Sequence, residues 1–596
     1  MTLPLQNYWV LMAQYLRPLK TKVFILAGLL LVTIGLQIVN PQIIRYFIDT
    51  AIGLGSNSAL DGAGDNLLFA AILFLVGALA HQALQLAAIY YSEDIGWRAT
   101  NRLREDLTLH CLNLDMGFHH EHKPGEMIER IDGDVANLAI FFSQFVVRIL
   151  GNGLLILGVI IALIWTDWRV SIALTLYSAG IVYAFVTTRN MAIPRWKAGR
   201  EASANLFGFI EEHLAGTEDV RSSGAVGYVM RNLFHHNKVR FDREVRSGRI
   251  NILVGNIWNA GHTVGQLIAF GMGFWLFQEG TLTVGAVYLV VHYTNMMLDP
   301  LGQITEEVRN FQQAAASIER IEELRVLDNQ IQTDNTLKKH VLTDGALGMS
   351  FEQVSFSYIA DELVLDDISF SLQPGQVLGL LGRTGSGKTT LTRLLFRLYD
   401  PAAGAICVHS ASMDKADLRT LDVHEVRARI GMVTQDVQIL QGTVRENVTL
   451  FDPAINDEQI LNVIDQLGVN DWFERLPQGL DTELQSEGGS LSAGEGQLLA
   501  FTRVFLHNPG LVILDEASSR LDPVTERLIE QAVDRLLQDR TAIIVAHRLE
   551  TVQRADHIMI LDDGKIQELG PRQALADDPN SRFYTLLQTG LEEVLS

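Results

Sequence analysis

A glycine-rich segment in the second half of the chain has the residue types and spacing that bind a polyphosphate. Residues 382–389 read Gly-Arg-Thr-Gly-Ser-Gly-Lys-Thr, between the apolar run Val377–Leu381 and a helical pattern over Leu391–Leu398. The glycines let backbone amides wrap around phosphate oxygens, and the N-terminus of the following helix adds partial positive charge. We expect Lys388 to reach the outer phosphates and Thr389 to offer its hydroxyl to Mg²⁺.

Two acidic residues close a second apolar run. Leu511–Leu514 is typical of a buried strand, and Asp515 and Glu516 follow it directly. A solvated strand end would be the preferred interpretation of these acids alone. Beside a complete phosphate loop they indicate more, because ligands bind at the carboxyl ends of the strands in open α/β sheets. Asp515 suits a metal ion, directly or through water, and Glu516 suits polarising the attacking water.

The elements that must position these residues belong to an α/β domain. Strand-like runs alternate with helical patterns, which predicts a largely parallel sheet. The preceding segment Asp328–Asp344 is polar and reads as a linker. We therefore place a linker at residues 326–348 and a P-loop nucleotide-hydrolysing domain at residues 349–596.

The first half of the chain holds six long apolar stretches. Most are near the twenty residues that a helix needs to cross the hydrocarbon layer of a membrane. Buried helices of a large soluble core are the alternative, but six such runs in one half disfavour it. We expect an all-α membrane domain of six helices over residues 1–325. The stretches are Val23–Phe47, Leu67–Tyr91, Ile140–Trp165, Val170–Ala192, Leu253–Phe277 and Leu282–Leu298.

The connections between the stretches alternate in length and charge. Those after the first, third and fifth stretches are short and almost free of Lys and Arg, whereas the second and fourth are long and basic. By the positive-inside rule, the long connections and both termini are cytoplasmic. The sequence thus predicts a multi-pass protein of the cell membrane, with its N-terminus and its nucleotide-hydrolysing domain in the cytosol. The polar, periodic connections suggest helices that continue past the bilayer.

Composition narrows the possible partners. The 596 residues carry a formal net charge of −22, which disfavours a nucleic acid held by a general basic surface. We expect no nucleic-acid partner and a solvated acidic surface instead. The two cysteines, Cys111 and Cys407, lie far apart and define no disulfide framework or metal cluster.

A third motif completes a family resemblance. Residues 491–495 read Leu-Ser-Ala-Gly-Glu, which resembles the LSGGQ signature of ATP-binding cassette (ABC) transporters, and Arg503 falls in the helix that follows the signature in that family. With the phosphate loop and the acid-ended strand, the chain resembles an ABC half-transporter of the exporter type over nearly its whole length. The resemblance implies ATP as the nucleotide, Mg²⁺ as the cofactor and a lipid bilayer as the surroundings.

The resemblance also implies roles for single residues. Tyr358 resembles the aromatic residue that stacks on adenine, and Gln435 the glutamine that links Mg²⁺ and water to the membrane domain. His547 resembles the switch histidine that contacts the γ-phosphate, and Asp522 lies in a segment like the D-loop. The implied ATP-binding residues are Tyr358, Gly382, Arg383, Thr384, Gly385, Ser386, Gly387, Lys388, Thr389 and Thr390. The implied catalytic residues are Glu516, His547 and Gln435, and the implied metal ligands are Thr389, Gln435 and Asp515.

Two short segments in the long connections resemble the coupling helices of the family, which rest on the ATPase domains. We expect them near Gly117–His122 and Phe207–His213. Simple exposed turns are the alternative interpretation.

The signature segment departs from the family pattern. In this family, ATP lies between the phosphate loop of one subunit and the signature of the other, so Ser492 and the Gly494 backbone would act on ATP bound by the partner. Ala493 adds a Cβ where glycine gives free backbone approach, and Glu495 brings a repulsive carboxylate close to the triphosphate. Beside an intact phosphate loop, this favours a heterodimer with a second half-transporter. One site would be competent, and the site that uses Ser492, Ala493, Gly494 and Glu495 would bind ATP but hydrolyse it poorly. A homodimer with a tolerated variant signature is the alternative.

The expected activity is ATP-driven export by alternating access, which requires ATP to bind the closed dimer better than the open one. The cargo would be an amphipathic or hydrophobic small molecule, lipid or peptide. Import or lipid flipping through the same fold is an alternative, and so is a regulatory or anchoring subunit without transport activity of its own. Polar residues in the second and fifth stretches face either a cavity or other helices, so they favour an amphipathic cargo only weakly.

Overall fold

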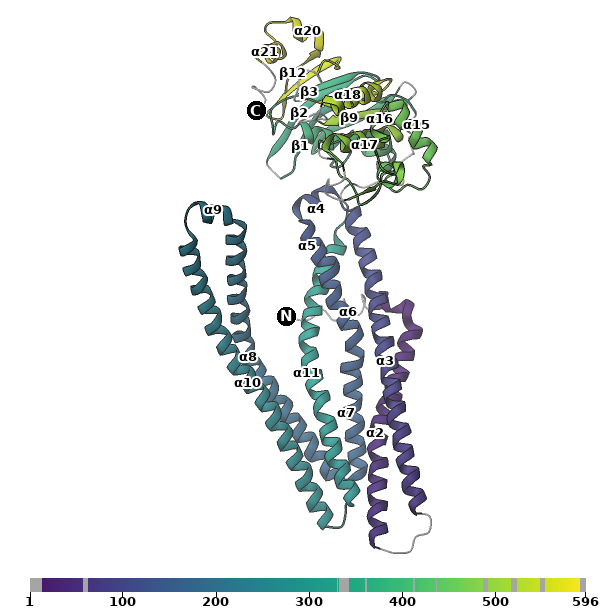
Figure 1. Cartoon of the computed structure of the whole chain (residues 1–596), viewed down its shortest axis with the longest axis vertical. Helices are drawn as coiled ribbons and strands as arrows, with labels where there is room; N and C mark the ends of the chain where they lie inside the picture. Colours follow the sequence, from purple (N-terminus) through teal and green to yellow (C-terminus); the bar gives the residue numbers. More distant parts are fainter. Residues whose placement is uncertain are drawn as a thin grey trace. The chain divides into compact units, whose positions relative to one another are not determined.

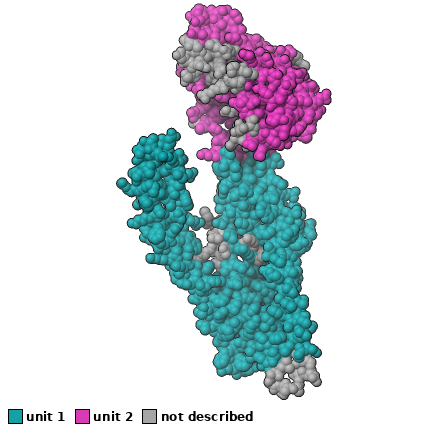
Figure 2. Space-filling view, viewed as in Figure 1, with its two compact units in different colours: residues 1–112, 124–327 teal, residues 113–123, 328–596 magenta. Residues whose placement is uncertain are grey.

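The computed structural model describes residues 13–56, 63–329, 331, 342, 344–359, 362–410, 413–435, 437–485, 491–515, 523–546 and 552–589. The chain divides into two compact units, which Figure 2 shows in different colours. Unit 1 comprises Met1–Leu112 and Pro124–Leu327, and unit 2 comprises Asn113–Lys123 and Asp328–Ser596. The six apolar stretches fall in unit 1 and the strand-rich pattern falls in unit 2.

The described residues of unit 1 form helices joined by short turns (Figure 1). The expected stretches lie in long helices, the third of them in α6, a π-helical segment at Phe145–Gly151 and α7. At about 1.5 Å per residue, the 48 residues of α8 extend roughly 70 Å, more than twice the hydrocarbon thickness of about 30 Å. The long helices are α2 (Lys20–Ser56), α3 (Ala63–Asn113), α6 (Val135–Gln144), α7 (Asn152–Thr166), α8 (Trp168–Ala215), α10 (Val226–Gln278) and α11 (Val284–Val326).

Among the described residues, four helical segments are both long and apolar enough to cross a membrane. The helices α10 and α11 have the length but are more polar on average, and polar side chains link them. Gln266 of α10, for example, donates to the Asn295 side-chain oxygen of α11 at 3.2 Å. The four segments are Ala13–Gly53, Gly64–Asn113, Arg148–Thr166 and Trp168–Ala215.

Charged hydrogen bonds fix α11 against the start of the third stretch. Asp134 is buried, and its carboxylate accepts from the Ser317 hydroxyl and the Arg320 guanidinium, both at 2.8 Å. Arg148 donates to the buried Glu307 at 2.9 Å. A buried carboxylate needs such partners to offset its desolvation, so these pairs specify how the helices meet.

Short helices interrupt the long connections, among them α4 (Met116–Glu121), α5 (Pro124–Ile128) and α9 (Thr217–Ser222). Asp115 caps α4 by accepting from the Phe118 amide at 3.1 Å, so a helix lies where the first coupling segment was expected. The second expectation was wrong: Phe207–His213 continues α8, and the short helix of that connection is α9, Thr217–Ser222. The helical backbone of α8 continues unbroken through Phe207–His213 and ends only at Ala215, where Gly216 is the C-cap. A separate short helix can therefore begin only after Gly216.

Unit 2 contains the predicted, largely parallel sheet. Its order is β12-β11-β3-β10-β9-β6 within the described residues, and only β12 runs antiparallel to its neighbour. A four-stranded antiparallel sheet, β2-β1-β4-β5, was not predicted. The strands are β1 (Gly348–Ser357), β2 (Leu363–Leu372), β3 (Val377–Leu381), β4 (Ala403–Ser410), β5 (Met413–Asp417), β6 (Ile430–Val433), β9 (Leu511–Asp515), β10 (Thr541–Val545), β11 (His557–Asp562) and β12 (Lys565–Pro571), beside a short pair, β7 (Gly442–Thr443) and β8 (Glu483–Leu484).

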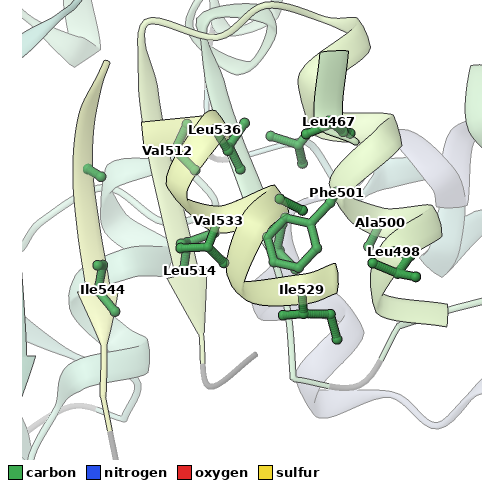
Figure 3. Packing of buried hydrophobic residues seen from close by; sticks show 14 of the residues in the cluster. Leu467, Leu498, Ala500, Phe501, Val512, Leu514, Ile529, Val533, Leu536 and Ile544 are labelled. Atoms are coloured by element: carbon green, nitrogen blue, oxygen red, sulfur yellow. The ribbon is translucent and has the colours of Figure 1, made fainter. Parts of the chain in front are cut away.

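Helices cover the parallel sheet and pack into its core. Phe501 of α17 and Val533 of α18 lie against Val512 and Leu514 of β9 (Figure 3), whereas Ile513 belongs to a second apolar cluster. Burial on both faces explains why β9 is apolar without alternation. The helices are α12 (Lys388–Leu395), α13 (Val423–Arg429), α14 (Val444–Thr449), α15 (Asp457–Leu467), α16 (Asn470–Phe473), α17 (Ala493–Leu506), α18 (Pro523–Leu537), α20 (Arg572–Asp577) and α21 (Arg582–Thr589).

Candidate functional site

The phosphate loop joins the end of β3 to the first residue of α12, as its sequence predicts. Gly382 has a φ of 154° and Gly387 a φ of 101°, values that side-chain-bearing residues rarely adopt. A Cβ on Gly382 would collide with the Leu561 carbonyl oxygen, and one on Gly387 would press on the Leu365 side chain. The neighbouring strands therefore fix the backbone conformation of the loop.

The side chains of the loop fit a polyphosphate. Lys388 is buried and donates to the carbonyl oxygens of Gly382 and Arg383, at 2.6 and 2.9 Å, so its ammonium lies over the loop. The Ser386 hydroxyl is buried and has no hydrogen-bond partner among the described residues. A phosphate oxygen bound here would accept a hydrogen bond from this buried hydroxyl and pair with the buried ammonium.

Tyr358 follows β1 and is joined directly to the phosphate-loop helix. Its hydroxyl lies 3.2 Å from that of Thr390 and accepts from Arg393 at 3.3 Å. The Tyr399 ring meets the Tyr358 ring edge-on at 5.2 Å, and the His120 ring of α4 lies 5.9 Å from it. The structure therefore brings the expected adenine-stacking residue and the expected ATP-binding Thr390 together.

The expected metal ligands follow strands of the parallel sheet. Thr389 is exposed in the first turn of α12, Asp515 is the half-buried last residue of β9, and Gln435 is exposed just after β6. Val433 of β6 pairs with Leu514 of β9, so Gln435 and Asp515 leave neighbouring strands at the same edge. Hydroxyl, amide and carboxylate oxygens are the donors that Mg²⁺ prefers, and the set fits it. Three other expected site residues, Glu516, Asp522 and His547, lie outside the described residues.

The signature segment begins α17. Ser492 is the N-cap, and its hydroxyl accepts from the Glu495 amide at 3.3 Å. The Glu495 carboxylate accepts from the Ser492 amide at 2.8 Å and from the Ser492 hydroxyl at 2.9 Å. This reciprocal capping box satisfies the free amides at the helix start. Ala493 is exposed and Gly494 is buried.

Arg503 holds α17 in place. Its guanidinium donates to the Asn447 carbonyl at 2.6 Å, to the Gln438 carbonyl at 2.9 Å and to the Asn447 side-chain oxygen at 2.9 Å. Burial lowers the pKa of Arg503. These bonds orient the helix that presents the signature.

Sequence reasoning missed two features of the site. The capping box had a readable signal, a serine followed three residues later by glutamate before an apolar run. The aromatic cluster of Tyr358, Tyr399 and His120 had none, because its members come from three distant segments.

A nucleotide site of this kind, carried on the same chain as helices of bilayer length, defines a transport ATPase. The family described as "ABC transporter" matches residues 365–519, and the one described as "ABC transporter transmembrane region" matches residues 23–301. Together the two segments cover most of the chain.

Individual relatives match nearly from end to end. The chain is 28% identical over 571 residues to the "Putative multidrug export ATP-binding/permease protein YgaD" of Bacillus subtilis (strain 168), covering 95% of this chain and 96% of that one. It is 29% identical over 577 residues to the "Uncharacterized ABC transporter ATP-binding protein YknV" of the same organism, covering 95% and 92%. Its fold resembles the "Structure of a bacterial Atm1-family ABC exporter with ATP bound", with a TM-score of 0.78, 23% identity, and coverage of 96% and 99%.

The chain therefore belongs to the ABC transporter family and is a half-transporter of the exporter type. It couples ATP hydrolysis to transport across a membrane, as a dimer, with the ATPase domain on the cytoplasmic side. The expected fold class, an all-α membrane domain followed by an α/β ATPase domain, is confirmed.

Proposed function

We propose that ATP is held between the phosphate loop of one half-transporter and the signature segment of the other, and that this clamp drives export. The observation that carries the proposal is the phosphate loop, in which a buried ammonium, an unsatisfied buried hydroxyl and a glycine-lined backbone converge. Residues 1–325 would form the membrane domain with the transport pathway, residues 326–348 the linker, and residues 349–596 the ATPase domain.

The proposed ligands follow from the site. Lys388 and the amides of residues 382–389 would bind the phosphates, while Tyr358 would stack on adenine and Thr390 would fix its hydroxyl. Thr389, Gln435 and Asp515 would hold Mg²⁺, which neutralises charge on the phosphates when bound. Glu516 would polarise the attacking water, with His547 at the γ-phosphate and Asp522 in the D-loop.

Replacing Glu516 by Gln tests the catalytic assignment. The amide keeps the shape of the side chain but cannot polarise water as a base, so ATP turnover should fall by a factor of at least about 100 while ATP binding persists. Turnover and nucleotide binding are measured on the full-length chain in lipid nanodiscs. Normal turnover would refute the assignment.

We further propose a heterodimer with unequal sites. The support is the contrast between a complete phosphate loop and a signature with Ala493 and Glu495 in place of the usual Gly and Gln. A homodimer would place this signature in both sites. Purification of the chain alone, and together with the product of the adjacent gene, decides between them: equal ATPase rates in the two samples would rule out the heterodimer.

The cargo we propose is amphipathic. Within unit 1, a cavity of about 490 Å³ combines aliphatic and polar walls, and its volume suits a drug-sized molecule. Two polar residues of the second stretch, His81 and Gln85, line it, with Asn152, Asp299 and Gln303. The name of one relative, a putative multidrug export protein of Bacillus subtilis, agrees with such a cargo. ATP-dependent accumulation of amphipathic dyes in inside-out vesicles tests both the cargo class and the direction; ATP-dependent depletion of the vesicle lumen would indicate import.

A further inference from the structure

Ser492, the signature serine, has one side-chain donor that could bind a phosphate, its hydroxyl. In this chain the hydroxyl already has an acceptor. It donates to the Glu495 carboxylate at 2.9 Å and accepts from the Glu495 amide at 3.3 Å. A serine hydroxyl carries a single proton, and an ionised carboxylate can only accept. The direction of the first bond is therefore fixed by chemistry.

The family pattern has a glutamine at position 495, and its amide would leave this proton free. A glutamine oxygen can complete the same capping box by accepting from the Ser492 backbone amide, as Glu495 does at 2.8 Å. A neutral amide oxygen is a weaker acceptor than a carboxylate, whose charge-assisted bonds are roughly twice as strong. A γ-phosphate would thus displace a glutamine oxygen as the acceptor of the Ser492 hydroxyl. Glu495 is the stronger competitor for the same hydrogen bond.

The other departure in the signature has no comparable effect. Ala493 is exposed and occupies the first turn of α17, whereas Ser492 and Glu495 are bound to each other. A methyl group neither accepts nor donates a proton, so Ala493 leaves the serine hydroxyl unchanged.

We propose that Glu495 weakens the ATP site completed by this chain's signature by retaining the Ser492 proton. The inference rests on the proposed function, in which Ser492 faces the γ-phosphate held by the second half-transporter. It assigns Glu495 as a positioning residue that acts through Ser492. Such a site distinguishes ATP from ADP less well, because the contact between the Ser492 hydroxyl and the third phosphate is lost.

The test compares affinities for ATP and ADP, which differ only in the γ-phosphate. The full-length chain carries Glu516→Gln to prevent hydrolysis and is studied in nanodiscs by competition against a fluorescent nucleotide. Every dimer that contains this chain has at least one site completed by its signature. Glu495→Gln should tighten ATP binding at that site about tenfold and leave ADP binding unchanged.

Two further variants separate proton capture from simple repulsion. In a Ser492→Ala background, Glu495→Gln should give no gain, because the proton at issue is absent. A matched control is Glu446→Gln, since Glu446 forms the same capping box with Thr443 on α14. That control should leave the ratio of ATP to ADP affinity unchanged.

The outcomes are distinct. An equal gain with and without Ser492 overturns the inference in favour of charge repulsion, and no gain in an ATP-binding dimer overturns it while leaving the proposed function intact. A chain that binds ATP but stays monomeric overturns the proposed clamp, and this inference with it.

Discussion

The phosphate loop and the signature segment both serve the phosphates of ATP in this family, yet here they are made differently. The loop offers backbone amides, and its conformation depends on Gly382 and Gly387, around which neighbouring strands leave no room for a side chain. The signature offers one side chain, Ser492, whose partner is Glu495. The fold therefore fixes the conformation of the phosphate loop, whereas one residue, Glu495, changes which hydrogen bonds the signature segment can offer.

The largest expected effect is on stability, and it comes from comparing a Gly→Ala substitution in the phosphate loop with one in the signature helix α17. Gly382→Ala should cost ~3 kcal/mol of stability in unit 2, because the new Cβ meets the Leu561 carbonyl and the backbone conformation is strained. Gly496→Ala, in α17, should be neutral or stabilising, since its Cβ would lie 3.8 Å from Ile439 in helical backbone. Thermal unfolding of the full-length variants measures both; equal midpoints would contradict the contrast.

The next effect concerns the charge at the loop. Lys388→Ala should weaken ATP binding on the order of 100-fold, since it removes a buried ammonium with charge-assisted bonds. Lys415→Ala is the control, because Lys415 pairs with Glu352 at an exposed position. Equilibrium nucleotide binding measures both variants, and ATP affinity within twofold of wild type for Lys388→Ala would remove Lys388 from the site.

A smaller effect is expected where the signature helix is anchored. Arg503→Lys should destabilise unit 2 by ~2 kcal/mol, because an ammonium cannot reproduce the three bonds of the guanidinium fork to Asn447 and Gln438. Arg475→Lys, whose guanidinium bonds a carbonyl at an exposed position, should change stability little. Denaturant unfolding distinguishes them, and indistinguishable midpoints would show that Arg503 is not an anchor.

The smallest effect separates capping from ligand binding. Ser492→Ala removes the N-cap of α17 and should cost ~1 kcal/mol of stability. Thr443→Ala, at the matching cap of α14, should cost about the same but leave ATP affinity unchanged. While Glu495 holds the Ser492 hydroxyl, Ser492→Ala should also leave ATP affinity unchanged. In a Glu495→Gln background, Ser492→Ala should weaken ATP binding and Thr443→Ala should not, and equal affinities there would show that the signature serine has no special role.

Much of the fold follows from local pattern. The six apolar stretches lie in helices, the phosphate loop joins β3 to α12, and the run before Asp515 is a strand, because each of these depends on neighbours in the chain. Four helical segments among the described residues are also apolar enough to cross a membrane. The antiparallel sheet was missed, since its β1 pairs with β4 about fifty residues later. The second short helix was misplaced by about ten residues, because the helical pattern through Phe207–His213 simply continues α8.

The sequence by itself determined the residue types of the nucleotide site and the membrane helices, because spacing along a strand, loop or helix fixes which backbone groups and side chains share a face. Only the tertiary structure decided which distant groups meet, such as Tyr358 with Thr390 and Arg503 with Asn447. Packing of the two sheets and their covering helices brings those pairs within hydrogen-bond distance, and no local pattern encodes that packing.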